Sequence, residues 1–293
     1  MKVAIYGRSF EDSFSEYVQE LFDKLAEFGW GVTIYEPYSS YLRPRLNLTE
    51  NLSTYNKHHE IKDDVNLMIS IGGDGTFLET IHIVKDSGIP ILGVNAGRLG
   101  FLASTQKEDI SAVLMDIKIG QYRLQERSLL ELSSNLDLFK GENFALNELT
   151  VHKKDSSSMI TIHTYIDDLY LNSYWADGLI IATPTGSTAY SLSCGGPILV
   201  PGATDFIITP IAPHNLNVRP VVVPDDAELT LKIAGRTENF LVALDSRSLT
   251  VPLSSELTIR KSPHQIKLIR LTDYSYLNTL RTKLIWGQDN RNY

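Results

Sequence analysis

A single carboxylate set among glycines is the feature of this sequence best suited to chemistry. Gly72, Gly73 and Gly75 surround Asp74, directly after an apolar run over residues 67–71. Glycines let the backbone approach a ligand closely, and the free amides of such a turn can bind a phosphate. A carboxylate beside a phosphate is useful if it orients magnesium or takes a proton from an attacking hydroxyl. These residues indicate phosphoryl transfer or, alternatively, a tight turn in which Asp74 only accepts hydrogen bonds from amides.

A hydroxyl-rich stretch in the second half offers another group of polar side chains. Residues 177–193 read DGLIIATPTGSTAYSLS, an apolar strand followed by a Thr/Ser/Gly turn and a short helix. Thr185, Ser187 and Thr188 can bond ribose hydroxyls or phosphates without adding charge, and Tyr190 can stack on a base. The alternative is a helix whose hydroxyl-rich first turn serves only as an N-cap.

Three further polar residues interrupt or border apolar strands. Asn147 suits an adenine edge and Glu148 suits ribose hydroxyls, but neighbouring strand residues face opposite sides, so one of them could simply face solvent. Asp177 has the same ambiguity, because Asp-Gly is an ordinary turn signal. Arg98, in a second glycine turn, could reach a phosphate or remain a solvated loop arginine.

The elements that must position Asp74 follow an alternating α/β pattern. The two glycine turns follow neighbouring strands, so we expect them to flank one crevice at the carboxyl ends of a parallel sheet. Thr76 and Glu79 have the spacing of a capping box, which predicts a helix that begins at Thr76. Residues 36–61 are too polar for a core element and are either a mobile lid or a surface insertion. The periodicity predicts strands at 2–6, 31–35, 67–71 and 91–94, with a helix over 11–28.

After residue 124 the pattern changes to short alternating strands, typical of a two-sheet sandwich. A helical pattern over 276–286 then predicts a tail that returns to the first domain. We therefore predict an α/β domain with a Rossmann-like parallel sheet over 1–124, on which 273–293 packs, and a mostly β domain over 125–272 that carries the hydroxyl-rich stretch. The predicted strands of the second domain cover 129–132, 145–152, 159–166, 169–174, 179–182, 206–209, 221–223, 228–233, 240–244 and 266–271.

Composition narrows the classes of protein. Of the 293 residues, 43% are hydrophobic and 21% are charged, which is typical of a globular protein. The net charge of −8, without a basic stripe, argues against nucleic-acid and anionic-membrane partners. The lone Cys194 excludes an internal disulfide framework, and the scattered histidines lack the spacing of a metal site. With neither a signal-peptide pattern nor a bilayer-length apolar run, we expect a cytoplasmic location.

These motifs together resemble the NAD kinase family. Gly72-Gly73-Asp74-Gly75-Thr76 alone would fit a wider set, including phosphofructokinases and lipid kinases, but the 177–193 run is far more specific. The resemblance implies magnesium- and ATP-dependent phosphorylation of the 2′-hydroxyl on the adenosine ribose of NAD, with Asp74 as the proton acceptor. It also implies assembly as a homodimer or homotetramer. A lipid kinase of the diacylglycerol type and a non-catalytic dinucleotide sensor are the alternatives.

The resemblance also implies which residues bind the dinucleotide. Asp74 and Gly75 would contact it, and Asn147, Glu148 and Asp177 would bind its ribose and base ends. The residues that would wrap the adenosine are Thr188, Ala189, Tyr190, Ser191, Leu192 and Ser193. The sequence departs from common family forms at Trp175 and at Ser246-Arg247.

Overall fold

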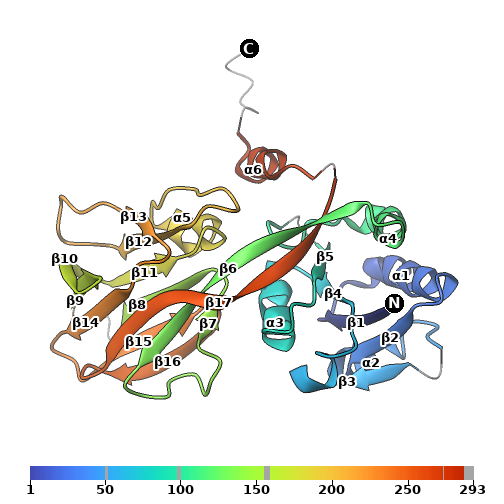
Figure 1. Ribbon diagram of the computed structural model, residues 1–293, viewed down its shortest axis with the longest axis horizontal. Helices are drawn as coiled ribbons and strands as arrows, with labels where there is room; N and C mark the ends of the chain where they lie inside the picture. Colours follow the sequence, from blue (N-terminus) through green and yellow to red (C-terminus); the bar gives the residue numbers. More distant parts are fainter. Residues whose placement is uncertain (50–51, 98–99, 155–158, 273, 287–293) are drawn as a thin grey trace, which may run out of the picture. The chain divides into compact units, whose positions relative to one another are not determined.

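The computed structural model describes residues 1–49, 52–97, 100–154, 159–272 and 274–286 (Figure 1). Its backbone forms two compact units. Unit 1 contains Met1–Glu126 and Ile266–Tyr293, and unit 2 contains Arg127–Gln265. The division into functional domains at 124/125 and 272/273 stays a prediction.

Unit 1 is built on a parallel sheet, as the α/β pattern predicted. The strand order is β5-β4-β1-β2-β3, and β1 aligns with β4 so that Gly7 lies opposite Ile71. The carboxyl ends of β1 and β4 therefore meet at one edge of the sheet, where the turn containing Asp74 begins. The strands are β1 (Lys2–Gly7), β2 (Gly31–Tyr35), β3 (Ser53–Tyr55), β4 (Leu67–Gly72) and β5 (Ile91–Asn95).

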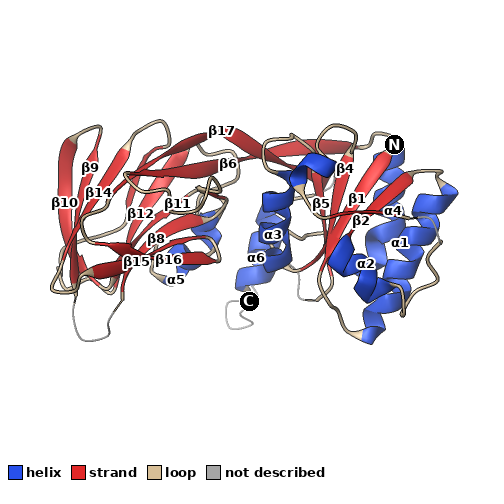
Figure 2. Cartoon of the chain, turned by 90° about the horizontal axis from the view of Figure 1, so that it is seen from below, coloured by secondary structure: helices blue, strands red, loops and turns tan. Residues whose placement is uncertain are grey.

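Helices pack on both faces of this sheet. On one face α1 and α4 lie side by side, and their apolar residues share a core with Leu67 and Ile69 of β4 (Figure 2). On the other face lies α3, where the Thr80 hydroxyl donates a 2.8 Å hydrogen bond to the Ser70 hydroxyl of β4. The helices are α1 (Ser15–Glu27), α2 (Glu36–Leu42), α3 (Asp74–Val84), α4 (Ile110–Lys118) and α6 (Tyr276–Leu284), with 3-10 turns at Asp12–Phe14, His58–Glu60 and Lys107–Asp109.

The expectation that residues 36–61 contain no core element was wrong. This range forms α2 and β3, and it buries Tyr38, Leu42, Tyr55 and Ile61. Tyrosine makes this possible because its ring packs as an apolar body while its hydroxyl bonds a polar partner. The buried Tyr55 hydroxyl, for example, donates to the Ile5 carbonyl at 3.1 Å.

The predicted capping box was also wrong. Helix α3 begins at Asp74, two residues before Thr76, and the Glu79 carboxylate does not turn back to cap it. Glu79 instead accepts from the Arg8 guanidinium at 2.5 and 2.7 Å and from the Tyr6 hydroxyl at 3.1 Å. Because these partners are at the end of β1, the carboxylate ties α3 to that strand.

Unit 2 is a sandwich of two mostly antiparallel sheets, as predicted. One sheet has the order β13-β12-β11-β8-β15-β16, and the other contains β10, β9, β14 and β17 together with β6 and β7. Their facing residues form one large core. The strands are β6 (Tyr122–Ser134), β7 (Phe144–Ala145), β8 (Glu148–Lys153), β9 (Ile160–Ile166), β10 (Leu169–Ala176), β11 (Gly178–Ala182), β12 (Asp205–Ile211), β13 (Val221–Pro224), β14 (Leu229–Ala234), β15 (Asn239–Leu244), β16 (Arg247–Pro252) and β17 (Glu256–Leu271).

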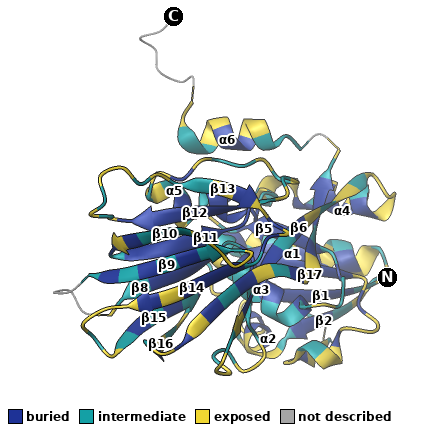
Figure 3. Cartoon of the chain, turned by 60° about the vertical axis from the view of Figure 1, so that its left-hand side comes forward, coloured by how far each residue is buried: buried dark blue, intermediate teal, exposed yellow. Residues whose placement is uncertain are grey.

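The outer face of β11 and β12 is covered as well. Strands β11 and β12 are buried along nearly their whole length (Figure 3). Ile180, Ala182 and Ile207 are fully buried on this face, against partly buried Cys194 and Leu199. The covering segment contains the 3-10 turn Gly186–Thr188 and helix α5 (Tyr190–Ser193). The hydroxyl-rich stretch is therefore a structural layer of unit 2 as well as a candidate binding segment.

The long strand β17 contributes to both units. Its first residues pair with β14 in unit 2, and its Leu268 pairs with Ile91 of β5 in unit 1. The tail after it belongs to unit 1, where the Arg123 guanidinium donates to the Tyr274 carbonyl at 2.8 Å. Across the described residues, no helix is long and apolar enough to span a membrane.

Candidate functional site

Asp74 is held by the backbone of a neighbouring loop. Its Oδ2 accepts from the Phe101 amide at 2.9 Å, and its Oδ1 accepts from the amides of Leu102 and Ala103 at 3.1 and 3.0 Å. A carboxylate offers about four acceptor positions, so these amides leave about one position unused. The Asp74 carboxylate thus accepts hydrogen bonds from amides, as expected for a tight turn. It can still accept a hydrogen bond from one more donor.

The same loop is held from its other side by Arg270 of β17. This side chain is 2% exposed and donates to the carbonyls of Phe101 and Leu102 at 3.0 and 3.2 Å, and to the Ser104 hydroxyl. Burial lowers the pKa of Arg270, while the nearby Tyr274 and Asp74 raise it. The sequence analysis did not select Arg270. An arginine within the largely apolar run 266–271 could have indicated a buried guanidinium that needs hydrogen-bond partners.

Gly100 provides the space that Asp74 occupies. A Cβ atom at residue 100 would lie 1.9 Å from Asp74 Oδ1, far inside contact distance. By contrast, a Cβ at Gly75 would meet nothing within 4 Å, and Gly75 is exposed. The glycine turn is therefore open to a ligand at Gly75. Arg98 lies outside the described residues.

A second carboxylate, Asp245, organises the start of β8 in the same way. It accepts from the consecutive amides of Leu146, Asn147 and Glu148 at 2.9, 2.8 and 3.2 Å, and its own amide donates to the Glu148 carbonyl at 3.0 Å. Asp245 has a φ of 51°, a conformation that aspartate tolerates better than most residues. Sequence reasoning did not select it; the available signal was an aspartate in the turn after an apolar strand.

Glu148 is a buried acid of unit 2 whose pKa is strongly raised. Burial and, to a smaller extent, the Asp245 charge raise its pKa to about 8, while a hydrogen bond from the Tyr190 amide opposes both. Its Oε2 atom is buried and has no hydrogen-bond partner among the residues that the structure describes. A ligand hydroxyl that reached Oε2 would supply the hydrogen bond that this oxygen lacks.

Asp177 lies at the opposite end of β11 from Glu148. In the ladder between β8 and β11, Gly178 pairs with His152 and Ala182 pairs with Glu148. Asp177 lies five residues along the strand from the position opposite Glu148, a span of about 16 Å, so the two acids could be bridged only by an extended ligand. The Asp177 carboxylate forms a 2.6 Å ion pair with Lys153. The exposed Tyr190 interacts electrostatically with both Asp177 and Glu148.

The hydroxyls of the Thr/Ser stretch mostly bond the protein itself. Ser187 Oγ donates to the Pro184 carbonyl at 2.7 Å, Thr188 Oγ1 donates to the Thr185 carbonyl at 3.2 Å, and Ser191 bonds Thr209 at 2.8 Å. Their first role in this structure is to fix the turn. The predicted site residues that remain exposed in this stretch are Tyr190 and Ser193, with Thr188, Ala189 and Leu192 partly buried.

This turn packs directly on the backbone of Asn147. A Cβ atom at Gly186 would lie 2.0 Å from the Asn147 carbonyl oxygen, and the Thr183 amide donates to that same oxygen at 2.9 Å. Unit 2 therefore brings together Asn147, Glu148 and the start of the turn.

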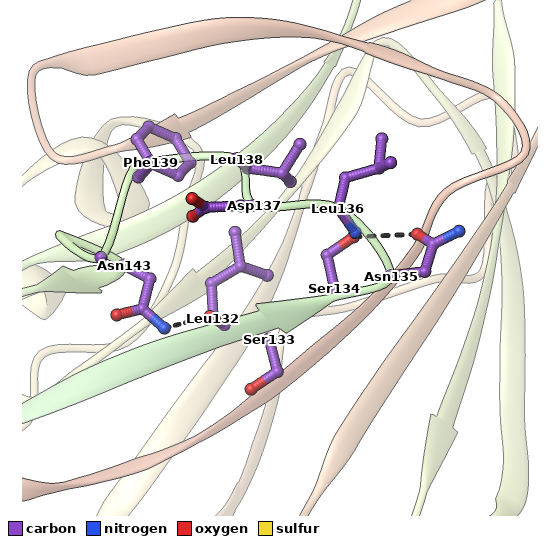
Figure 4. Close-up of a pocket in the computed structure, with 10 residues that line it drawn as sticks. Leu132, Ser133, Ser134, Asn135, Leu136, Asp137, Leu138, Phe139 and Asn143 are labelled. Carbon is purple, nitrogen blue, oxygen red and sulfur yellow. Dashed lines mark hydrogen bonds between the residues drawn. The ribbon is translucent and has the colours of Figure 1, made fainter.

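A pocket of 340 Å³ in unit 2 contains none of the predicted site residues. It is lined by the continuous stretch 132–139 together with Gly141 and Asn143, and Asn143 Nδ2 donates to the Leu132 carbonyl at 2.7 Å (Figure 4). Such a hollow within one loop fits a packing gap, and we assign it no role. Within the described part of the chain, no three His, Cys, Asp or Glu side chains gather as metal ligands.

Comparisons with known proteins cover nearly the whole chain. The family model for the ATP-NAD kinase N-terminal domain matches residues 3–122, and that for the ATP-NAD kinase C-terminal domain matches residues 146–271. An NAD kinase from Flavobacterium psychrophilum is 49% identical over 100% of both chains. One from Bacteroides fragilis is 44% identical over 99% of this chain and 100% of its own.

Solved structures share the fold. Yeast NADH kinase complexed with NADH superposes with a TM-score of 0.86 at 21% identity, covering 99% of this chain and 88% of that one. An NAD kinase from Archaeoglobus fulgidus in complex with ATP gives 0.74 at 23% identity, covering 97% and 99%. The family matches and the full-length identities show that the chain belongs to the NAD kinase family.

Proposed function

We propose that this protein transfers the γ-phosphoryl group of ATP to the 2′-hydroxyl on the adenosine ribose of NAD, giving NADP and ADP. Relatives that match it over their full length are NAD kinases, and the comparisons support neither a lipid kinase nor a non-catalytic sensor. The structural observation that carries the proposal is the Asp74 carboxylate, fixed by three amides beside an open glycine turn.

Asp74 would act as the general base. A ribose hydroxyl is a weak nucleophile near neutral pH, and a positioned base contributes about 10²–10⁴-fold to such a reaction. The unused acceptor position of Asp74 would take the hydroxyl proton. The amides of the glycine turn and of the first turn of α3 would stabilise the charge on the transferred phosphoryl group.

Residues of unit 2 would bind the dinucleotide, together with Gly75 of unit 1. Glu148 offers the unpartnered Oε2 to a ribose hydroxyl, and the exposed Tyr190 ring offers a stacking surface for a base. Asn147 and Asp177 would bind the remaining polar groups of the ribose and base ends. The segment 188–193 would enclose the adenosine.

Magnesium would be held chiefly by the phosphates of ATP and by water. Such a site suits this chain, because the described residues contain no three-ligand cluster and Mg²⁺ commonly uses only one or two carboxylates. The bound ion would neutralise charge on the phosphate oxygens. We further propose a cytoplasmic location and a homodimeric or homotetrameric assembly.

The function is tested by incubating purified protein with magnesium, ATP and NAD, and by measuring NADP with an NADP-specific dehydrogenase. NADP should form only when both substrates are present. Absence of NADP across several divalent metals and phosphate donors would overturn the assignment.

Asp74→Asn tests the base. We expect kcat to fall by about 10²–10⁴-fold with little change in the Kd for NAD. An asparagine amide would face one of the loop amides as donor against donor, so a thermal melt must accompany the kinetics. Near-normal turnover by a folded variant would refute the base assignment.

A further inference from the structure

A pocket of 280 Å³ lies at the carboxyl ends of β1 and β2 in unit 1. Its lining includes Gly7 and Arg8 after β1, Tyr35 at the end of β2, and Tyr38 and Tyr41 of α2. Ligand pockets for drug-sized molecules run from about 300 to 1,000 Å³. This pocket therefore suits one ring system rather than a whole dinucleotide.

Aromatic rings form much of the wall. Tyr6 and Tyr35 lie with their centroids 4.8 Å apart at 34°, and Tyr38 and Tyr41 lie 6.1 Å apart and nearly parallel. Proteins commonly bind a nucleobase by stacking it on aromatic side chains, and such stacking accepts any base because every base has a flat π-face. A flat heteroaromatic ring is the ligand that such a wall favours.

One polar group of the wall lacks a partner. The Tyr38 side chain is 2% exposed, and its hydroxyl has no hydrogen-bond partner among the described residues. Its ring lies against Gly7, where a Cβ atom would be 2.5 Å from Cζ, the carbon that bears the hydroxyl. The hydroxyl end of Tyr38 is thus at the pocket, and a ring nitrogen of a ligand would satisfy it.

The pocket is a short distance from the glycine turn. Gly7 pairs with Ile71 of β4, and β2 flanks β1 on the other side. Strands are about 4.8 Å apart, so the pocket lies roughly 5–10 Å along the sheet edge from the turn at 72–75. A ribose and triphosphate can span that distance. Arg8 borders the pocket and forms an ion pair with Glu79 of α3. A guanidinium group therefore lies beside the route that the triphosphate would take from the pocket to the glycine turn.

We infer that this pocket binds the purine ring of the phosphoryl donor, so that the nucleotide runs along the sheet edge with its γ-phosphoryl at Asp74. The inference rests on the proposed function, which supplies a nucleoside triphosphate as donor. Stacking on the face of a tyrosine ring holds the base, and the Tyr38 hydroxyl donates to a ring nitrogen.

Tyr38→Phe is the sharpest test, because it removes only the unpartnered hydroxyl. We expect the KM for ATP to rise about three- to tenfold, with the KM for NAD and kcat unchanged. The melting temperature should not fall, because the removed hydroxyl is buried without a hydrogen-bond partner and so does not stabilise the folded protein. Tyr17→Phe, on α1 outside the pocket, should leave every parameter unchanged. An unchanged KM for ATP in Tyr38→Phe would overturn the inference.

Photolabelling of the wild-type protein with 8-azido-ATP tests the position directly. The label should fall on peptides that contain residues 6–9 or 35–41, and excess ATP should abolish it. Labelling confined to other peptides would overturn the inference. If the wild-type protein made no NADP, the proposed function would fail, whereas NADP formation with labelling elsewhere would refute only the base pocket.

Discussion

Two aspartates of this protein use their carboxylates in the same way. Asp74 accepts from the amides of residues 101–103, and Asp245 accepts from those of residues 146–148. The first set of hydrogen bonds fixes the loop that holds Asp74 in place. The second set fixes the backbone of Asn147 and Glu148. Both aspartates are partly buried, and in Asp245 burial raises the pKa although the three amides oppose that shift.

Glu148 should make the stability of the fold depend on pH. Its pKa is raised from 4.5 to about 8, so between these values the folded state keeps a proton that the unfolded state releases. The free energy of unfolding should therefore decrease as the pH rises from 4.5 to 8, by about 1.4 kcal/mol for each pH unit within that range.

Urea unfolding at pH 5 and pH 8 measures this effect in the wild type and in Glu148→Gln, which cannot titrate. We expect the wild type to lose at least about 1 kcal/mol more than the variant over that range. Glu16→Gln, at an exposed position, should follow the wild type. Equal losses in the wild type and Glu148→Gln would contradict the buried, neutral Glu148.

At the scale of elements, the loop 100–104 is what positions Asp74. It is bonded to the carboxylate through its amides and to Arg270 through its carbonyls. Phe101 also lies 6.3 Å from the Tyr276 ring of α6, measured between ring centroids. The loop therefore has partners on α3, β17 and α6, and its conformation depends on all three.

Gly100→Ala should impair catalysis without removing any catalytic group. The added methyl would overlap Asp74 Oδ1, so the carboxylate or the loop must shift. A displacement near 1 Å can cost about 10²-fold in kcat. Steady-state kinetics of NADP formation measure this loss.

Gly97→Ala is the matched control for that substitution. It adds the same methyl group in the same glycine turn, where a Cβ atom meets nothing within 4 Å. Its kcat should match that of the wild type. Similar losses in both variants would indicate a general sensitivity of the turn rather than the overlap with Asp74.

Several elements could be predicted from sequence because their burial follows a simple period. The strands β2 and β11 and the α/β order of unit 1 are examples. Helix α2 and strand β3 were missed because tyrosines such as Tyr38 and Tyr55 supply much of their buried surface, and a tyrosine hydroxyl is equally compatible with an exposed position. Asp245 and Arg270 were missed because their partners are distant in the chain: Asp245 is 98 residues from Asn147, and Arg270 is 169 from Phe101.

At the scale of the whole molecule, unit 1 is discontinuous in sequence. Its last part, beginning at Ile266, arrives after the chain has completed unit 2. Ile266, Leu268 and Ile269 of β17 are 1%, 1% and 4% exposed. Burying each such side chain contributes about 1.5–3 kcal/mol, so the three together approach the roughly 5–15 kcal/mol that stabilises a typical domain.

Ending the chain after Gln265 should therefore unfold unit 1. Circular dichroism should show a loss of helix, and limited proteolysis should degrade residues 1–126 first. The full-length protein, prepared in the same way, is the control. A truncated chain with the full helical signal would contradict the dependence of unit 1 on β17.

The contact between Gly186 and Asn147 limits which sequences can carry this site. The atom that a side chain at position 186 would strike is a main-chain oxygen, which every residue at position 147 possesses. A second substitution at 147 consequently offers no compensation for the loss of this glycine. Covariation between homologous sequences would not reveal the pair, although a Cβ atom at Gly186 would make the shortest contact of any glycine of unit 2 that the structure describes.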